Sequence, residues 1–145
     1  MPKSYDQPCP VAKALEILGD RWTLLIIRDL LLGKERFQEL QESLPGIASN
    51  VLSDRLKNLE SNEIVETKLY SDHPPRYCYH LTRRGKELGL IIGALYNWGQ
   101  KNTATGSNLI DQNCGHQVEL CYFCRTCNSK VKRSNVRPLK MPGAD

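Results

Sequence analysis

The sequence predicts a mainly α fold of the α+β class: a winged helix-turn-helix with N- and C-terminal dimerisation helices and a small Cys-rich C-terminal extension. Three observations lead to this prediction. Apolar residues recur at helical spacing in 47–60, after a Pro-Gly turn. Two stretches rich in β-branched and aromatic residues, 64–70 and 77–81, follow and predict a β-hairpin. Apolar stripes at 11–18 and 88–98 predict a helix at either end.

Capping residues predict the first two helices. Pro10 suits the first position of a helix, which makes Cys9 its N-cap. Asp20 is expected to cap a second helix over about 21–32, and Gly33 is expected to end it. This second helix is apolar on nearly all sides, so we expect it at the centre of the core.

A helix-turn-helix pair is predicted over 34–61. Residues 34–37 lead into a short helix that ends before Pro45, and Ser49 is expected as the N-cap of the next helix, 50–61. One face of that helix is apolar, with Leu52, Leu56 and Leu59. The other face carries groups that form hydrogen bonds or ionic contacts, namely Asn50, Ser53, Asp54 and Lys57. Such a helix suits the major groove of DNA, and an ordinary amphipathic surface helix is the alternative.

The hairpin is expected to have a six-residue polar tip, 71–76, which contains two prolines. His73 and Arg76 in this tip can reach phosphates or the minor groove beside the helix, or else simply face solvent. Cys78, in the second strand, is expected to be a small buried apolar residue.

The C-terminal helix is expected to begin after Thr82 and to cover about 83–100. Its apolar stripe is wider than one small domain needs, and the N-terminal helix carries a second stripe. Large exposed apolar patches are unusual on monomers, so we expect a homodimer; the alternative is that both stripes cover the core.

Several blocks in this order resemble the HxlR family of bacterial winged-helix regulators, namely Cys9–Val11, Leu18–Ile26, Arg36–Phe37, Leu52–Glu60 and Tyr79–Gly85. The resemblance covers residues 9–102. It implies a homodimeric repressor or activator that binds an inverted-repeat operator in double-stranded DNA through a dimer of the terminal helices. The expected DNA-contact residues are Arg36, Ser49, Asn50, Ser53, Asp54, Lys57, His73 and Arg76. Arg55 lies at the flank of the polar face, where it either braces the fold through a carboxylate or touches a phosphate.

Composition limits the class of function. The 145 residues, with a formal charge of +4, suffice for one domain and an appendage. No apolar run approaches the roughly 18 residues of a membrane span and no signal-peptide pattern is present, so we expect a cytoplasmic protein without a membrane partner. Residues 9–104 carry 13 basic and 12 acidic residues, so DNA affinity must come from local placement and dimerisation. No catalytic grouping is recognised, so no enzyme activity is expected.

The C-terminal extension concentrates potential metal ligands: Cys114, His116, Cys121, Cys124 and Cys127. Four of these five could hold Zn²⁺, with Cys124 and Cys127 on a tight turn and Asn128 in a left-handed conformation. Reduced cysteines in a small β-hairpin and a thiol switch are the alternatives.

Cys9 is a candidate redox sensor. The positive end of the helix dipole favours a thiolate at this position. Some relatives resemble sensors that use a cysteine here to detect an electrophile or oxidant, which would be the inducer. Modification near a dimer interface would alter the spacing of the two recognition helices. The Cys-Pro pair also belongs to the general family pattern, whether or not a member senses anything.

These predictions divide the chain into a flexible N-terminal arm (1–8), the HxlR-type domain (9–104), the Cys-rich extension (105–140) and a disordered end (141–145). The predicted function is a sequence-specific, homodimeric DNA-binding transcription regulator that responds to redox state or electrophiles. The alternative is a winged-helix protein-interaction module with a structural zinc knuckle.

Overall fold

The structure is a computed structural model that describes residues 4–139 of the chain, so the predicted disordered end at 141–145 lies outside the described residues. The chain divides into two compact units, Met1–Ile92 and Gly93–Asp145. Among the described residues, no helix is long and apolar enough to cross a membrane. The elements in chain order are α1 (Pro10–Leu18), α2 (Thr23–Leu31), α3 (Phe37–Ser43), α4 (Ser49–Ser61), β1 (Val65–Asp72), β2 (Pro75–Leu81), α5 (Arg83–Lys86), α6 (Gly89–Thr103), β3 (Tyr122–Cys124), β4 (Ser129–Val131) and the 3₁₀ helix η1 (Arg133–Asn135).

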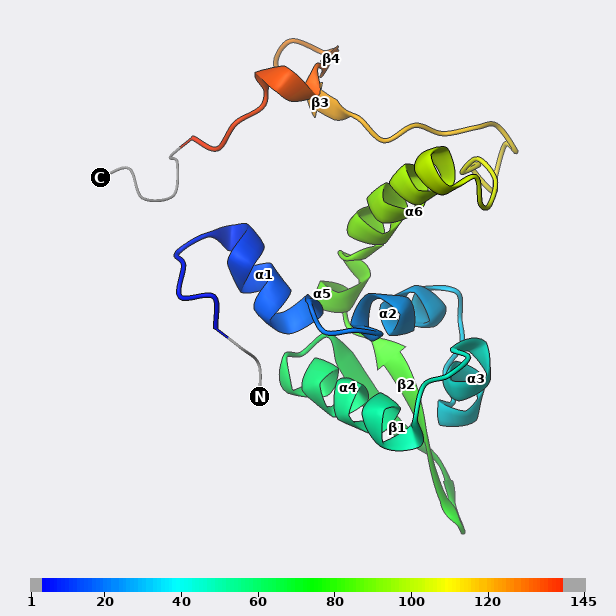
Figure 1. Ribbon diagram of the computed structural model, residues 1–145. Helices are drawn as coiled ribbons and strands as arrows, with labels where there is room; N and C mark the ends of the chain where they lie inside the picture. The colour runs from blue at the N-terminus through cyan, green and yellow to red at the C-terminus, as the bar shows by residue number, and fades with distance from the viewer. Residues whose placement is uncertain (1–3, 140–145) are drawn as a thin grey trace. The chain divides into compact units, whose positions relative to one another are not determined.

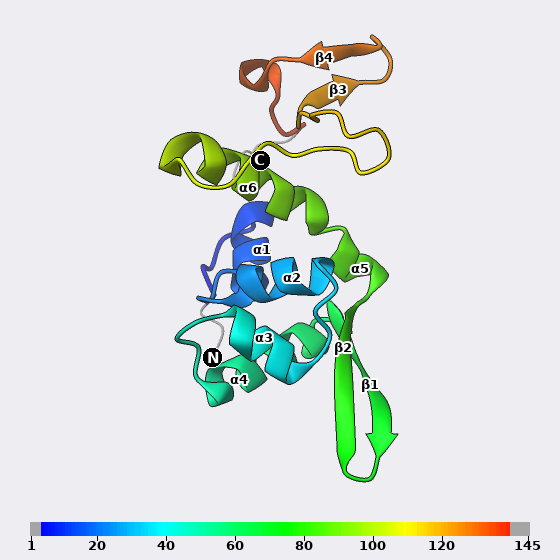
Figure 2. The same cartoon turned by 90° about the vertical axis from the view of Figure 1, so that its right-hand side faces the viewer.

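The first unit packs its helices against the base of the β1–β2 hairpin. Helix α2 contacts both α3 and β2, and α4 contacts β1. In two perpendicular views the hairpin projects beyond these helices (Figure 1, Figure 2). Ile26 and Ile27 of α2 are fully buried, but Leu25 and Leu31 of the same helix are 40% and 37% exposed, so the predicted central helix is buried on one side and not all round. The core that Ile26 and Ile27 form with apolar residues of α3, α4 and the hairpin base fixes the directions of α4 and of the hairpin.

Helix α2 begins later than the sequence predicts. Trp22 has a positive φ of 81°, so the helix starts at Thr23 and not near residue 21. The prediction that Asp20 caps this helix is wrong, because the N-cap position is Trp22 and no side chain caps it. Gly33, with a φ of 88°, ends the helix as predicted, because glycine adopts this conformation without steric cost.

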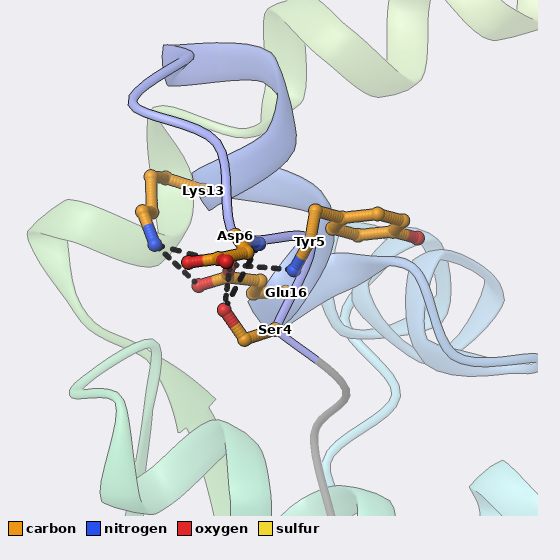
Figure 3. A network of polar contacts seen from close by, with 5 residues as sticks. All are labelled: Ser4, Tyr5, Asp6, Lys13 and Glu16. Carbon is orange, nitrogen blue, oxygen red and sulfur yellow. Dashed lines mark hydrogen bonds and ion pairs between the residues drawn. The ribbon is translucent and has the colours of Figure 1, made fainter.

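The residues that precede α1 are held by the carboxylate of Glu16 (Figure 3). Its Oε1 accepts hydrogen bonds from the hydroxyl of Ser4 at 3.3 Å, the backbone N–H of Tyr5 at 3.1 Å and the ammonium of Lys13 at 3.1 Å. These contacts, the Lys13 hydrogen bond foremost, lower the pKa of Glu16. The predicted flexibility of residues 1–8 stays a prediction.

The β1–β2 hairpin is longer and tighter than predicted. Its antiparallel register runs from Val65 opposite Leu81 to Asp72 opposite Pro75 and shifts between Leu69 and Ser71. The prediction of a six-residue tip is wrong, because residues 71 and 72 pair with residues 76 and 75 and leave only two residues to turn the chain. A proline is tolerated as the first residue of a strand, which is why the Pro-rich segment did not end the pairing.

The prediction of one helix over 83–100 is also wrong, since two helices, α5 and α6, occupy this segment. Thr82 does cap α5, because its hydroxyl accepts a hydrogen bond from the N–H of Gly85 at 3.1 Å. The N–H of Leu88 then bonds the carbonyl of Gly85 at 3.1 Å, a spacing of three residues that tightens the chain between the helices. Glycines at 85 and 89 weaken helical continuity here.

The second unit is built around a short hairpin. Strands β3 and β4 pair antiparallel, with Tyr122 opposite Val131 and Cys124 opposite Ser129. The ammonium of Lys130 lies 2.9 Å from a carboxylate oxygen of Glu119, which lowers the pKa of Glu119.

Candidate nucleic-acid interface

Helix α4 has the two faces that the sequence predicts. Leu52, Leu56 and Leu59 have exposed fractions of 0%, 2% and 0%, so the inner face is anchored in the core. On the outer face Asn50, Asp54 and Lys57 are exposed and Ser53 is half-buried. The core thus fixes the helix while its polar groups remain free to contact a partner.

Ser49 links the two helices of the helix-turn-helix and does not cap the second one. Helix α4 begins at Ser49 itself, after an extended Ala48 at the N-cap, so the capping prediction is wrong. The side-chain amide of Gln41 donates a hydrogen bond of 2.7 Å to the Ser49 hydroxyl, which ties α3 to the start of α4. Gln41 was missed in the sequence, because a polar residue near a helix end is ordinary.

Arg55 braces the fold, which is one of the two interpretations left open by the sequence, and its contact with a phosphate stays a prediction. Its Nε donates a hydrogen bond of 3.0 Å to the backbone carbonyl of Arg21. Another guanidinium nitrogen lies 3.7 Å from a carboxylate oxygen of Asp20. These contacts tie α4 to the turn that precedes α2.

The start of α3 is fixed by a carboxylate. One oxygen of Glu39 accepts hydrogen bonds of 3.0 Å from the backbone N–H groups of both Arg36 and Glu35. These bonds, that of Arg36 foremost, lower the pKa of Glu39. The Arg36 guanidinium lies 5.0 Å from the ring centroid of Tyr70, within the range of a cation–π contact. Tyr70 was missed in the sequence, where an exposed aromatic residue on a strand is not distinctive.

The β1–β2 hairpin is the wing of the winged helix, and its two predicted contact residues lie at its far end. His73 and Arg76 are both exposed. Arg76 belongs to strand β2, opposite Ser71, and not to a loop as predicted. Pairing in the strand restricts the backbone of Arg76 and leaves its side chain free.

Cys9 occupies the predicted N-cap position of α1, with Pro10 as the first helical residue. Its side chain is half-buried. A thiol at this place experiences the positive end of the helix dipole.

The structure brings together two of the five candidate metal ligands. The backbone N–H of Cys127 lies 3.5 Å from the sulfur of Cys124, and this bond is the main cause of a lowered pKa of Cys124. Asn128, with a φ of 51°, has the predicted left-handed conformation. Within residues 4–139, no three His, Cys, Asp or Glu side chains group closely enough to hold a metal ion. A zinc site that includes Cys114, His116 or Cys121 stays a prediction, and metal analysis of the purified protein would test it.

Comparison with known proteins agrees with this geometry. Residues 17–107 match the family described as HxlR-like helix-turn-helix. The chain is 34% identical over 137 residues to Rv3095, an HTH-type transcriptional regulator of Mycobacterium tuberculosis, covering 92% of this chain and 86% of the relative. It superposes on the crystal structure of the transcription-factor candidate PA1607 with a TM-score of 0.79 and 29% identity, covering 94% and 97% of the two chains.

A redox regulator is also among the similar structures. The reduced form of HypR matches with a TM-score of 0.62 and 32% identity, covering 66% of this chain and 94% of HypR. The family match spans well over half of the chain and includes the helix-turn-helix and hairpin described above. This chain therefore belongs to the HxlR-like helix-turn-helix family of DNA-binding transcriptional regulators.

Proposed function

We propose that this chain acts in the cytoplasm as a homodimer that binds an inverted-repeat DNA operator, with α4 of each copy in a major groove. The observation that carries this proposal is the division of α4 into a fully buried leucine face and an outer face of Asn50, Ser53 and Lys57. A helix anchored in this way presents its polar groups at fixed positions, as base recognition requires.

Each group on this face has a chemistry that suits its role. The Asn50 amide can donate to and accept from an adenine edge, and Ser53 can bond either kind of base. Lys57 supplies a positive charge for a phosphate. The Gln41–Ser49 bond and the contacts of Arg55 hold α4 in position and do not involve the side chains of Asn50, Ser53 or Lys57.

The hairpin and the start of α3 provide further contacts in this proposal. Exposed His73 and Arg76 at the end of the hairpin reach the DNA backbone or the minor groove beside α4. Arg36, held at the N-terminus of α3 and against Tyr70, contacts a phosphate. These contacts position the protein, whereas α4 reads the sequence.

Exposed apolar side chains support the dimer. Val11 and Leu15 of α1 are 67% and 41% exposed, and on α6 Leu95 and Trp98 are 50% and 66% exposed. Large apolar side chains gathered on a helix face indicate a partner surface. A second copy would cover them and would place two α4 helices on two half-sites of an inverted repeat.

We further propose Cys9 as the site at which an oxidant or electrophile changes DNA binding. Its place at the N-terminus of α1, close to the exposed apolar side chains of that helix, supports this role. HypR, a similar structure, is a redox regulator.

Fluorescence anisotropy with DNA from upstream of the chain's own gene tests the proposal, with unrelated DNA as competitor. Selective binding is expected, and Asn50→Ala should weaken specific binding by about 1–3 kcal/mol while leaving thermal unfolding unchanged. Lys101→Ala, on an exposed part of α6, is the control. Lack of selectivity would favour a winged-helix protein-interaction module. Loss of the oxidant response in Cys9→Ser, with binding retained, would assign the sensor.

A further inference from the structure

A second cysteine lies among polar groups on the wing. Cys78 was predicted to be a small buried apolar residue, but its side chain is half-buried and has polar neighbours. Cys78 and His80 are two residues apart in β2, so their side chains share one face of the hairpin. The sulfur of Cys78 lies 3.2 Å from Nε2 of His80 and 3.5 Å from the carbonyl oxygen of Lys68 on β1.

A carboxylate lies beside the imidazole, at ion-pair distance. Oε1 of Glu35 lies 3.4 Å from Nδ1 of His80, on the side of the ring opposite the thiol. The Glu35 backbone is fixed in turn, since its carbonyl accepts a 2.7 Å hydrogen bond from the N–H of Tyr79. In the neutral tautomer that carries its proton on Nδ1, beside the carboxylate, Nε2 is the ring nitrogen that can accept the thiol proton. The order thiol, imidazole, carboxylate is the arrangement that activates nucleophilic cysteines.

A cavity borders the imidazole and carboxylate side of this cluster. Glu35 and His80 line a cavity of about 390 Å³, together with Leu30, Leu31, Leu81 and Lys86. The leucines make part of the wall apolar, and the His80 side chain retains 29% exposure. His80 therefore both contacts the thiol and lines this mixed polar and apolar cavity, whereas Cys78 itself does not line it.

We propose that Cys78 is a nucleophilic thiol that forms covalent adducts with soft carbon electrophiles of the α,β-unsaturated carbonyl class. Nε2 of His80 takes the thiol proton, and the sulfur forms a bond to the β-carbon as the C=C π bond breaks. The electron pair moves to the α-carbon, which then receives the proton from the imidazolium. The product is a thioether, and no oxidant or reductant is consumed.

An adduct at Cys78 would change the positions of the DNA-binding elements. Cys78 and Arg36 form an isolated antiparallel bridge, so the segment that enters α3 lies directly against β2 at this residue. Arg36 is also the N-cap residue of α3, and its guanidinium lies over the ring of Tyr70 on β1. Added volume at the sulfur pushes this segment and the hairpin apart, which lowers DNA affinity. This consequence rests on the proposed DNA-binding function, whereas the reactivity of the thiol does not.

Reactivity is measured first, without DNA, on the full-length reduced protein. N-ethylmaleimide is added at neutral pH in limiting amount, and peptide mapping by mass spectrometry follows each cysteine. Cys78 should react roughly tenfold faster than the more exposed Cys114, since a positioned general base assists it. His80→Gln should remove this advantage and leave the rate of Cys114 unchanged, whereas His73→Gln, on the same hairpin, should leave both rates unchanged.

Equal rates for Cys78 and Cys114 in the unsubstituted protein would overturn the proposal, and so would an unchanged Cys78 rate in a folded His80→Gln variant. The first comparison needs no substitution and therefore holds even if that variant does not fold. Glu35→Gln should slow Cys78 less than His80→Gln does, because it removes the negative charge beside the imidazole and keeps the base.

Coupling to DNA is measured in a Cys9→Ser background, so that the other proposed sensor does not contribute. Treatment with N-ethylmaleimide should lower specific affinity at least roughly tenfold, and the Cys9→Ser/Cys78→Ser protein should resist the treatment. Unchanged affinity with Cys78 fully alkylated would refute the coupling. Failure of the untreated protein to bind DNA would refute both the operator proposal and the coupling. The reactivity of Cys78 would still be decided by the peptide mapping alone.

Discussion

Gly85→Ala is expected to destabilise the first unit, because the structure leaves no room for a side chain at this position. A Cβ built on Gly85 would overlap the backbone carbonyl oxygen of Ile64 and would lie 2.9 Å from Cδ2 of Leu81. The Ile64 oxygen cannot move freely, since it accepts a hydrogen bond from the backbone N–H of Thr82 at 3.0 Å, while the Thr82 hydroxyl donates to the neighbouring Glu63 carbonyl at 2.6 Å. A side chain at residue 85 would therefore force α5 away from the end of β2.

The expected loss of stability is the sum of three contributions, two that destabilise the fold and one that stabilises it. Overpacking a filled site costs about 1–3 kcal/mol. Loss of the hydrogen bond from the Thr82 N–H to the Ile64 carbonyl adds about 1 kcal/mol. The better helix propensity of alanine returns at most about 1 kcal/mol. The free energy of unfolding of Gly85→Ala should thus fall by about 2 kcal/mol.

Urea unfolding followed by circular dichroism, at equal protein concentrations, measures this change. Gly89→Ala is the matched control, because its Cβ would meet only Cδ2 of Leu31 at 3.8 Å, an ordinary contact. Its stability should stay within about 0.5 kcal/mol of the original. If Gly85→Ala were as stable as Gly89→Ala, the close packing of α5 on Ile64 would be refuted.

Three further changes test the interface and its supports. Lys57→Ala should weaken binding to all DNA sequences alike and reduce the slope of log affinity against log salt by about 1, as measured by anisotropy in a salt series. Arg55→Ala should lower the free energy of unfolding by about 1 kcal/mol, because it removes the hydrogen bond to the carbonyl of Arg21; an unchanged urea midpoint would contradict this. The pKa of Glu39 in the folded chain lies below its ordinary 4.5. The stability that this carboxylate provides is therefore present above the unfolded pKa and is lost as pH falls through the folded pKa. Glu39→Gln should lower stability at neutral pH and flatten the acid limb of a pH–stability curve, and an unaltered curve would argue against this capping role.

The helices with clear periodicity could be predicted from the sequence. The spacing of Leu52, Leu56 and Leu59 identified the buried face of α4, because a helix of 3.6 residues per turn places them on one side. The Cys9-Pro10 start of α1 followed from the fixed φ of proline. Such local rules suffice where one residue type decides the conformation.

The errors occurred where distant segments meet. The break between α5 and α6 accompanies the packing of Gly85 on Ile64, a contact 21 residues apart in the chain. The oxygen of Ser49 was expected to cap α4, but Gln41 of the preceding helix binds it. The cluster of Cys78 and His80 shares a strand face and could have been noticed, whereas the contribution of Glu35 depends on the path of the chain into α3. Propensity and spacing do not encode these tertiary contacts.

The Glu35–Arg36 segment also protects the hairpin from self-association. A two-stranded hairpin has two open edges, and each offers unpaired backbone groups to a strand from another molecule. The N–H of Tyr79 bonds the carbonyl of Glu35, and Arg36 bridges to Cys78, so part of the outer edge of β2 is already occupied. On β1, the charged side chains of Glu66 and Lys68 disfavour the approach of a foreign strand. The wing can therefore project far from the core, as contact with DNA requires, without becoming a template for aggregation.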